Sequence, residues 1–257
     1  MPIPKIIHYC WFGGNPIPEK YKRYMESWKK FCPGYDIMEW NERNYDIMQN
    51  KYICEAYKSK KWGFVTDFVR LDVVYQNGGI YFDTDVELIK PLDTLLSNKA
   101  FMGFEDGEHV NTGLGFGAEK NLGIIRELRD HYLNIKFLNE DGTYNLTVCP
   151  VHQTNCLLKH GLVQNNAKQI VEGIAIYPSE YFSPKRWDTG KTRITANTFS
   201  IHHFSASWYS NEQRVHREIV QKLCRIFSYR IASKFANFVV ALKYKGLEYI
   251  ISKFYKK

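Results

Sequence analysis

The chain has 257 residues, of which 44% are hydrophobic and 16% aromatic, enough for one large domain or one and a half ordinary domains. Its start lacks a basic segment followed by an apolar stretch, and no run approaches roughly eighteen apolar residues, so the sequence predicts neither a secretory signal nor a membrane span. The six cysteines show no C-x-x-C or zinc-type spacing, which predicts reduced, mostly buried thiols in a cytoplasmic protein.

The first informative element is a predicted helix that begins near residue 61 and ends at Asn77-Gly78-Gly79. Its apolar residues suit a well-buried helix, and the glycine pair supplies a left-handed stop. Within it, Asp67 and Arg70 stand at i and i+3 and share a face. A surface ion pair is the simplest explanation, but charged groups among apolar neighbours are rare unless they are paired or functional. We therefore predict a site role for both residues.

The most informative feature follows, where a predicted strand from Ile80 leads into Asp83-Thr84-Asp85. Side chains at i and i+2 of a strand point to the same face, about 6.5 Å apart, so both carboxylates can converge on one divalent cation. Such a cation usually also holds phosphate oxygens. A solvated acidic turn is the alternative for an isolated D-x-D, and the helix upstream favours the metal site.

Downstream, residues 110–118 are predicted to form a strand whose small residues allow close approach of a ligand, with Asn111 as a donor-sugar contact. The glycine spacing in this segment does not match a dinucleotide-binding fingerprint, because no helix follows it directly. Residues 18–32 and 121–138 are predicted to supply helices.

The end of the chain differs from the rest in charge. Residues 211–257 contain eleven lysines and arginines against three acidic residues, a net +8 that equals the formal charge of the whole protein. Apolar residues recur among them at largely helical spacing, so this stretch is predicted to be a basic amphipathic helix or helix pair. It either packs on the catalytic domain with a solvated basic face or lies on an anionic membrane surface. No nucleic-acid-binding module is recognisable.

Three motifs together carry a family resemblance: Ile6-Ile7-His8-Tyr9-Cys10-Trp11-Phe12-Gly13-Gly14, Asp67-x-x-Arg70, and Gly78-Gly79-Ile80-Tyr81-x-Asp83-x-Asp85. The chain resembles the DxD glycosyltransferases of family 32 over residues 3–120, and less closely to about residue 210. That family includes capsular polysaccharide transferases and yeast initiating mannosyltransferases, and it shares sequence blocks with the glucosylating domain of large bacterial cytotoxins.

The resemblance implies a role for each matching residue. Trp11 would stack on the nucleotide base, since an indole offers a flat apolar face. Asp67 and Arg70 would hold the ribose, donor sugar or phosphates, for which an arginine fork is suited. Tyr81 would line the same pocket, and Asp83 and Asp85 would bind the Mn²⁺ or Mg²⁺ that bridges the diphosphate.

Two later segments match the family more loosely. Residues 149–154 are similar in position to an active-site loop, where Gln153, or else its neighbour His152, would lie beside the anomeric carbon. The string Phe199 to Trp208 resembles the closing motif, in which a histidine completes the metal shell and Ser207-Trp208 folds over the diphosphate. His202 and His203 point to opposite faces of a strand, so one of them meets the metal, and His202 is the choice.

The resulting hypothesis is an α/β fold of the GT-A type, Rossmann-like and nucleotide-sugar-binding, over residues 1–210, with a C-terminal basic helical extension over residues 211–257. The resemblance implies metal-dependent, retaining transfer of a hexose, more plausibly from a UDP-hexose than from GDP-mannose, to a glycan or lipid-linked acceptor in capsule or lipopolysaccharide synthesis. The expected location is the cytoplasmic face of the membrane. The alternatives are a D-x-D phosphohydrolase of the haloacid-dehalogenase kind and a non-enzymatic membrane-binding protein.

Overall fold

The computed structural model describes residues 2–205 and 209–254, and the side chains of all of these except residues 247–254. Its strands are β1 (Ile6–Cys10), β2 (Asp36–Trp40), β3 (Gly79–Tyr81), β4 (Val86–Leu88), β5 (Ala100–Gly103), β6 (Phe116–Ala118), β7 (Gln169–Val171), β8 (Ile174–Tyr177) and β9 (Ser200–His202). Its α-helices are α1 (Glu19–Phe31), α2 (Lys51–Lys58), α3 (Trp62–Asn77), α4 (Gly123–Asp130), α5 (Cys149–Leu158), α6 (Asn211–Leu223) and α7 (Tyr229–Phe254).

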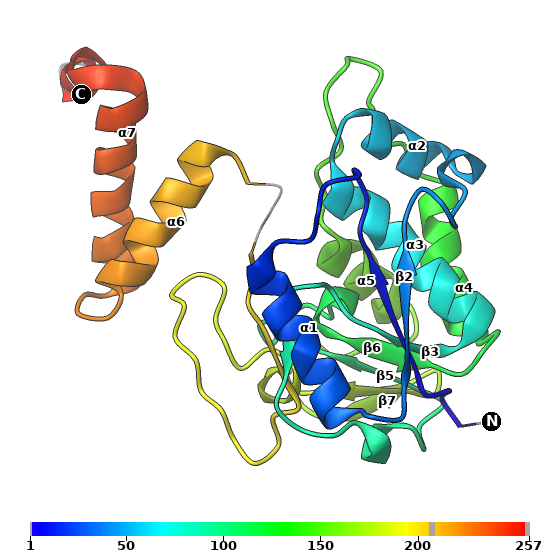
Figure 1. Ribbon diagram of the computed structural model, residues 1–257. Helices are drawn as coiled ribbons and strands as arrows, with labels where there is room; N and C mark the ends of the chain where they lie inside the picture. Colours follow the sequence, from blue (N-terminus) through cyan, green and yellow to red (C-terminus); the bar gives the residue numbers. More distant parts are fainter. Residues whose placement is uncertain (1, 206–208, 255–257) are drawn as a thin grey trace. The chain divides into compact units, whose positions relative to one another are not determined.

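Seven strands form one mixed sheet in the order β2-β1-β3-β6-β5-β8-β7, and β4 pairs with β9 in a separate two-stranded ladder (Figure 1). Strand β1 runs parallel to both β2 and β3, and β5 runs parallel to β8. Strands β6 and β7 run antiparallel to their partners. The α/β architecture expected from the sequence is confirmed.

Helices on two sides bury the sheet. Residues of α2, α3, α4 and α5 share one hydrophobic cluster with side chains of β5, β6 and β8. Helix α1 packs elsewhere, because its fully buried Trp28 meets Tyr9 of β1 edge-on and lies against Phe82. The alternation of side chains along β1 explains this, since Tyr9 faces α1 while its neighbour Cys10 joins the α3 cluster.

Helix α3 forms and ends as the sequence predicts. Ten of its sixteen residues are buried, which only a helix covered on several sides can achieve. Gly78 caps it with φ of 70°, and its N–H donates to the carbonyl oxygen of Val74 at 2.8 Å. Gly79 then adopts φ of 100°, where a β-carbon would lie 2.8 Å from the carbonyl oxygen of Ile6. The glycine pair is therefore what lets β3 start so close to β1.

Several local predictions were wrong. Asp83 and Asp85 lie in the turn between β3 and β4, because β3 ends at Tyr81. Residues 110–118 are not one strand: Thr112–Leu114 form a 3₁₀ turn held by the Asn111 side chain, and only β6 is extended.

Two helix boundaries also differ from the sequence prediction. Residues 149–154 begin helix α5 instead of forming a loop, with Pro150 in the first turn, where its missing N–H is tolerated. The helix predicted over residues 121–138 stops at Asp130 and continues only as the 3₁₀ turn His131–Leu133.

The chain divides into two compact units, one of residues 1–184 and 194–203 and the other of residues 185–193 and 204–257. In the second unit, α6 begins at a capping box in which Ser210 and Gln213 bond reciprocally. Helix α7 packs Ala232 and Ala236 against Val220 and Cys224, and its Val240 is also buried. The predicted C-terminal helices are thus present, while the division into a catalytic domain and an extension at residue 210 stays a prediction.

All six cysteines are free, and all but Cys54 are buried. Within the described part of the chain, no helix combines the length and apolarity needed to cross a bilayer.

Candidate functional site

The sheet creates a natural crevice beside β1 and β3. These parallel neighbours pair Ile7 with Ile80 and His8 with Tyr81, while β2 continues the sheet on the other side of β1. In open α/β sheets, ligands bind outside the carboxyl ends of the strands where the strand order reverses. Trp11 directly follows β1, and Asp83 lies two residues after β3, so the topology brings both predicted residues to this edge.

Three potential metal ligands converge after β3. Ligand atoms of Asp83, Asp85 and His202 all lie within 4.8 Å of one another, and no other such group of three occurs among the described residues. The Nε2 atom of His202 is 3.0 Å from Asp85 Oδ1 and 3.9 Å from Asp83 Oδ2. Although burial disfavours the imidazolium, the nearby carboxylates, Asp85 first, raise the pKa of His202. The carboxylates therefore favour positive charge at this point, where a divalent cation would compete with a proton on His202.

The β4–β9 ladder positions the histidine, because His202 pairs with Val86, the residue after Asp85. The adjacent His203 faces away: its Nε2 lies 2.8 Å from Glu87, and its ring stacks on Tyr24 at 4.0 Å. The opposite orientation of neighbouring strand residues thus separates one histidine of the pair from the cluster.

Arg70 links the helix to the acidic turn. Its guanidinium Nη2 atom lies 3.1 Å from Asp67 Oδ1 and 3.3 Å from Asp83 Oδ1, and the side chain is almost fully buried. Bonds from Nε to the Thr66 carbonyl and from Nη2 to Thr66 Oγ1 fix the orientation of the fork. Burial raises the pKa of Asp67 to about 6, against the opposing effect of Arg70. One arginine therefore serves two carboxylates, which leaves the group rich in negative charge.

Tyr81 is buried beneath this group, and its predicted place in the donor pocket stays a prediction. Its hydroxyl donates to Asp83 Oδ1 at 3.0 Å, and the Arg70 guanidinium lies 5.1 Å above its ring. Gly113 closes over the other side of Asp83. A β-carbon on Gly113 would lie 2.5 Å from Asp83 Oδ2 and 2.8 Å from Arg70 Nη1, so any larger residue there would have to displace these side chains.

Asn111 is fixed by bonds at both ends of its amide. Its Oδ1 accepts from the Gly113 N–H at 2.6 Å, and its Nδ2 donates to the carboxylate of Glu105. Sequence reasoning missed Glu105, whose pKa is raised by burial despite the bond from Asn111. The available signal was an acidic residue directly after the apolar run of β5.

Gln153 lies on α5 and bonds to the loop that contains Asn111. Its Oε1 accepts from the Thr112 N–H at 3.1 Å, and its Nε2 donates to Thr112 Oγ1 at 2.7 Å. It therefore positions the loop that carries Asn111 and Gly113. The alternative residue, His152, belongs to another cluster: its Nδ1 lies 3.0 Å from His131 Nε2, and burial lowers its pKa to about 4.

Trp11 lines a cavity of about 640 Å³ at the carboxyl end of β1. Its Nε1 donates to the Asn15 carbonyl at 2.5 Å, and its ring meets Tyr21 edge-on. The other lining residues come from the glycine loop, the end of β2, the segment after β2, and α2: Gly13, Gly14, Asn15, Pro16, Glu39, Asn41, Glu42, Arg43 and Tyr57. The half-exposed indole and polar neighbours such as Asn41 are compatible with a stacked base.

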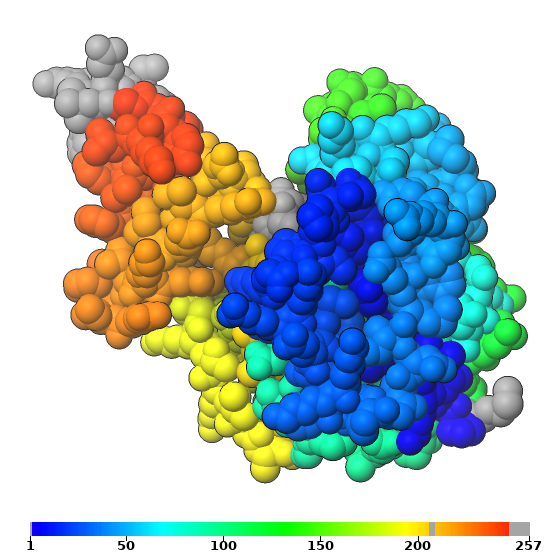
Figure 2. Space-filling model, in the orientation of Figure 1, coloured from blue at the N-terminus to red at the C-terminus, as the bar shows by residue number. Residues whose placement is uncertain are grey.

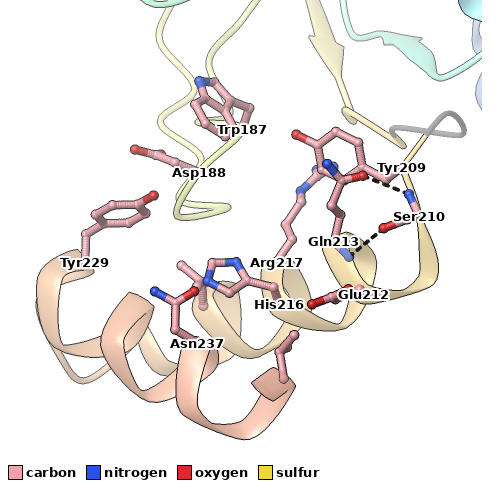
Figure 3. A pocket seen from close by; sticks show the side chains of 12 residues that line it. Trp187, Asp188, Tyr209, Ser210, Glu212, Gln213, His216, Arg217, Tyr229 and Asn237 are labelled. Atoms are coloured by element: carbon pink, nitrogen blue, oxygen red, sulfur yellow. Dashed lines mark hydrogen bonds between the residues drawn. The ribbon is translucent and has the colours of Figure 1, made fainter. Parts of the chain in front are cut away.

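The second unit has a pocket of its own, of about 670 Å³. Figure 3 shows Trp187 and Asp188 of the 185–193 segment facing His216 and Asn237 of the two helices. Two of its polar residues, Ser210 and Gln213, are bonded to each other in the capping box of α6. The pocket contains no group of three clustered metal ligands among its described side chains. The predicted lid residues Ser207 and Trp208 lie outside the described residues.

Comparisons with known proteins identify a family match within the first unit. Residues 18–102 match a family model described as a glycosyltransferase sugar-binding region containing a DXD motif. The chain is 31% identical over 142 residues to inositol phosphoceramide mannosyltransferase 3 of Schizosaccharomyces pombe, covering 52% of this chain and 40% of that protein. It is 27% identical over 107 residues to an initiation-specific alpha-1,6-mannosyltransferase of Candida albicans, covering 38% of this chain and 28% of that one.

The chain thus spans less than half the length of these two relatives. Among solved structures, the PaToxG glycosyltransferase matches 62% of this chain and 70% of its own, with a TM-score of 0.50 and 21% identity. At that identity the likeness supports the fold alone, and it agrees with the GT-A type expected for the first unit. The matched region contains Asp67, Arg70, Asp83 and Asp85, and the phosphohydrolase alternative gains no support from any of these matches. The resemblance seen in the sequence is therefore confirmed: this chain carries a glycosyltransferase sugar-binding region with its DXD motif.

Proposed function

We propose that the protein transfers a hexose from a nucleotide diphosphate sugar to a hydroxyl group of an acceptor. One observation carries the proposal: the Asp83, Asp85 and His202 ligand atoms gather within 4.8 Å at the sheet edge that also holds Trp11. A nucleotide diphosphate has a base that an indole would stack on and phosphates that a bound cation would hold, so this pair of features favours it as the ligand.

The donor set fits a divalent cation. Two carboxylates and an imidazole suit Mn²⁺, while Mg²⁺ prefers oxygen ligands alone. Asp83, Asp85 and His202 would hold the ion, which when bound would neutralise charge on the diphosphate leaving group. The raised pKa of His202 agrees with a site that attracts positive charge.

The protein's own residues would orient the donor. Arg70 is anchored by Thr66, so its fork is fixed for phosphate or sugar oxygens near Asp83. Asn111 would contact the sugar, and Gln153 would act through Thr112 as a positioning residue for that loop. We propose retention of anomeric configuration by front-face attack, with a donor phosphate oxygen accepting the proton of the acceptor hydroxyl.

The identity of the donor is a further proposal. A UDP-hexose is our first choice, from the family resemblance. The relatives are named mannosyltransferases, which favours mannose as the second candidate and GDP-mannose as its donor. A glycan or lipid-linked acceptor in capsule or lipopolysaccharide synthesis, used at the cytoplasmic face of a membrane, is proposed because of the basic C-terminal helices.

Thermal unfolding of the full chain with Mn²⁺ and a panel of UDP- and GDP-sugars tests the proposal. A ligand at about 100 times its Kd adds about 2.7 kcal/mol of stability, so the true donor should raise Tm only when Mn²⁺ is present. Donor hydrolysis over the same panel then identifies the sugar. Asp85→Asn should lose both responses. Hydrolysis of a phosphate monoester without any response to nucleotide sugars would instead support a phosphohydrolase.

A further inference from the structure

Helix α7 carries an apolar stripe that the described side chains of its own unit leave partly exposed. Ile231, Phe235, Phe238 and Leu242 are 55%, 53%, 48% and 43% exposed. Their spacing of i, i+4, i+7 and i+11 confines them to about 60° of the helix circumference. Isolated exposed apolar residues are ordinary, but four large ones aligned over three turns form a continuous surface.

The stripe is separate from the face that holds the helix pair together. Ala232 and Ala236 are buried in one cluster with Val220 and Cys224, and Val240 is buried further along α7. By helical geometry the centre of that buried face lies roughly 130° from the centre of the stripe. The stripe therefore lies away from the buried contact of α6 with α7, and its side chains are about half exposed.

The turn between the helices extends the apolar surface. Ile226 is 82% exposed and Phe227 is 47% exposed, the former more than any other large apolar residue for which exposure is described. In Figure 2 the orange and red atoms of this turn and of α7 stand on the surface of the second unit.

The charge around the stripe has one sign. Residues 224–246 contain five basic residues and no acidic residue: Arg225, Arg230, Lys234, Lys243 and Lys245. Lys234 and Arg230 lie beside one edge of the stripe by helical geometry. A second copy of the same surface would bring like charges together, whereas an anionic surface complements them.

We infer that α7 and the preceding turn bind the surface of an anionic lipid bilayer, with the stripe in the headgroup region and the basic residues near lipid phosphates. A helix with phenylalanine on one face and lysine and arginine beside it has the composition of an interfacial helix. No described helix is able to span the bilayer, so the contact is peripheral. The inference does not depend on the transfer reaction, since the second unit contributes none of Trp11, Asp67, Arg70, Asp83, Asp85 and His202.

Co-sedimentation of the full chain with vesicles tests the inference. Vesicles with phosphatidylglycerol should bind the protein, pure phosphatidylcholine vesicles should bind it at least tenfold less, and 1 M salt should release it, because the Debye length falls from about 10 Å at 0.1 M to about 3 Å. The double variant Phe235→Ser and Phe238→Ser should lose binding to anionic vesicles. Arg230→Gln and Lys234→Gln should each weaken it about fivefold.

Ile170→Ser is the matched control, since Ile170 is 76% exposed but lies on β7 in the first unit, and it should bind vesicles as the parent does. Donor hydrolysis in solution should be unchanged in all variants, which separates failure of this inference from failure of the proposed reaction. Equal binding to both vesicle types, or no binding to either, overturns the inference. A change of oligomeric state in the double serine variant, measured by light scattering, would overturn it in favour of a second copy on the stripe.

Discussion

Helix α3 carries two buried aspartates, Asp67 and Asp72, whose surroundings differ in kind. Asp72 accepts from the Tyr45 hydroxyl at 2.7 Å and from Gln76 at 2.8 Å, and it pairs with Arg129 at 3.1 Å. Asp67 instead shares the single guanidinium of Arg70 with Asp83. Both aspartates stand on one helix, five residues apart, and both are at most 6% exposed.

The two aspartates differ in how far their negative charge is compensated. Around Asp72 each oxygen of the carboxylate has a donor, so the group is neutralised and the fold alone accounts for it. Around Asp67 the carboxylates outnumber the arginine, and Asp85 and His202 adjoin the same turn. Burial of several carboxylates beside one arginine is unfavourable unless positive charge compensates it, which agrees with the proposed metal site.

The largest effect on transfer is expected when an aspartate of the turn after β3 is removed. Asp83→Ala or Asp85→Ala should reduce transfer about a thousandfold or more while the fold stays intact, because each removes a proposed metal ligand and relieves repulsion between carboxylates. Transfer rates and the Mn²⁺-dependent rise in Tm are the measurements. Asp36→Ala, at an exposed position on β2, is the control. Full activity in either site variant would contradict the metal assignment.

Loss of Asp72, whose charge is compensated, should lower stability and leave ligand binding unchanged. Asp72→Ala leaves Tyr45 and Arg129 without a buried partner on α3 and should lower the free energy of unfolding by about 3–5 kcal/mol. Urea unfolding measures this loss. The folded fraction should keep its Tm response to Mn²⁺ and donor, and a stable but unresponsive variant would place Asp72 in the site.

Gly113 tests how closely the loop must approach the acidic turn. Gly113→Ala puts a β-carbon 2.5 Å from Asp83 Oδ2 and should displace the carboxylate, with a fall in transfer of about a hundredfold. Gly123→Ala is a matched control, since a β-carbon there meets nothing within 4 Å. Steady-state kinetics of the two variants compare them directly. Equal activity would show that the loop moves freely.

The smallest effect is expected at the edge of the site. Trp11→Ala should raise the donor KM about tenfold and change acceptor KM much less, since stacking on a base is worth about 1–3 kcal/mol. Trp187→Ala, in the pocket of the second unit, should leave the donor KM unchanged. An unaltered donor KM in the Trp11 variant would make this residue part of the packing against Tyr21.

Several features of the fold and the site could be predicted from the sequence, because they depend on residues close together along the chain. Helix α3 with its glycine stop, the acidic pair after an apolar run, and the basic amphipathic end each follow from local pattern and charge. The motif spacing also sufficed to identify the DXD region.

The tertiary structure decided what lies opposite each of these groups. Nothing local distinguishes Asp67 from Asp72, since the difference comes from Asp83, Tyr45 and Arg129, which approach from other elements. The same holds for Glu105 against Asn111 and for Gln153 against Thr112, whose bonds form only once α5 and the loop after β5 meet. The sequence determines which ionisable and polar groups a residue carries. Whether a buried charge is compensated depends on residues from distant segments, and only the folded chain brings those segments together.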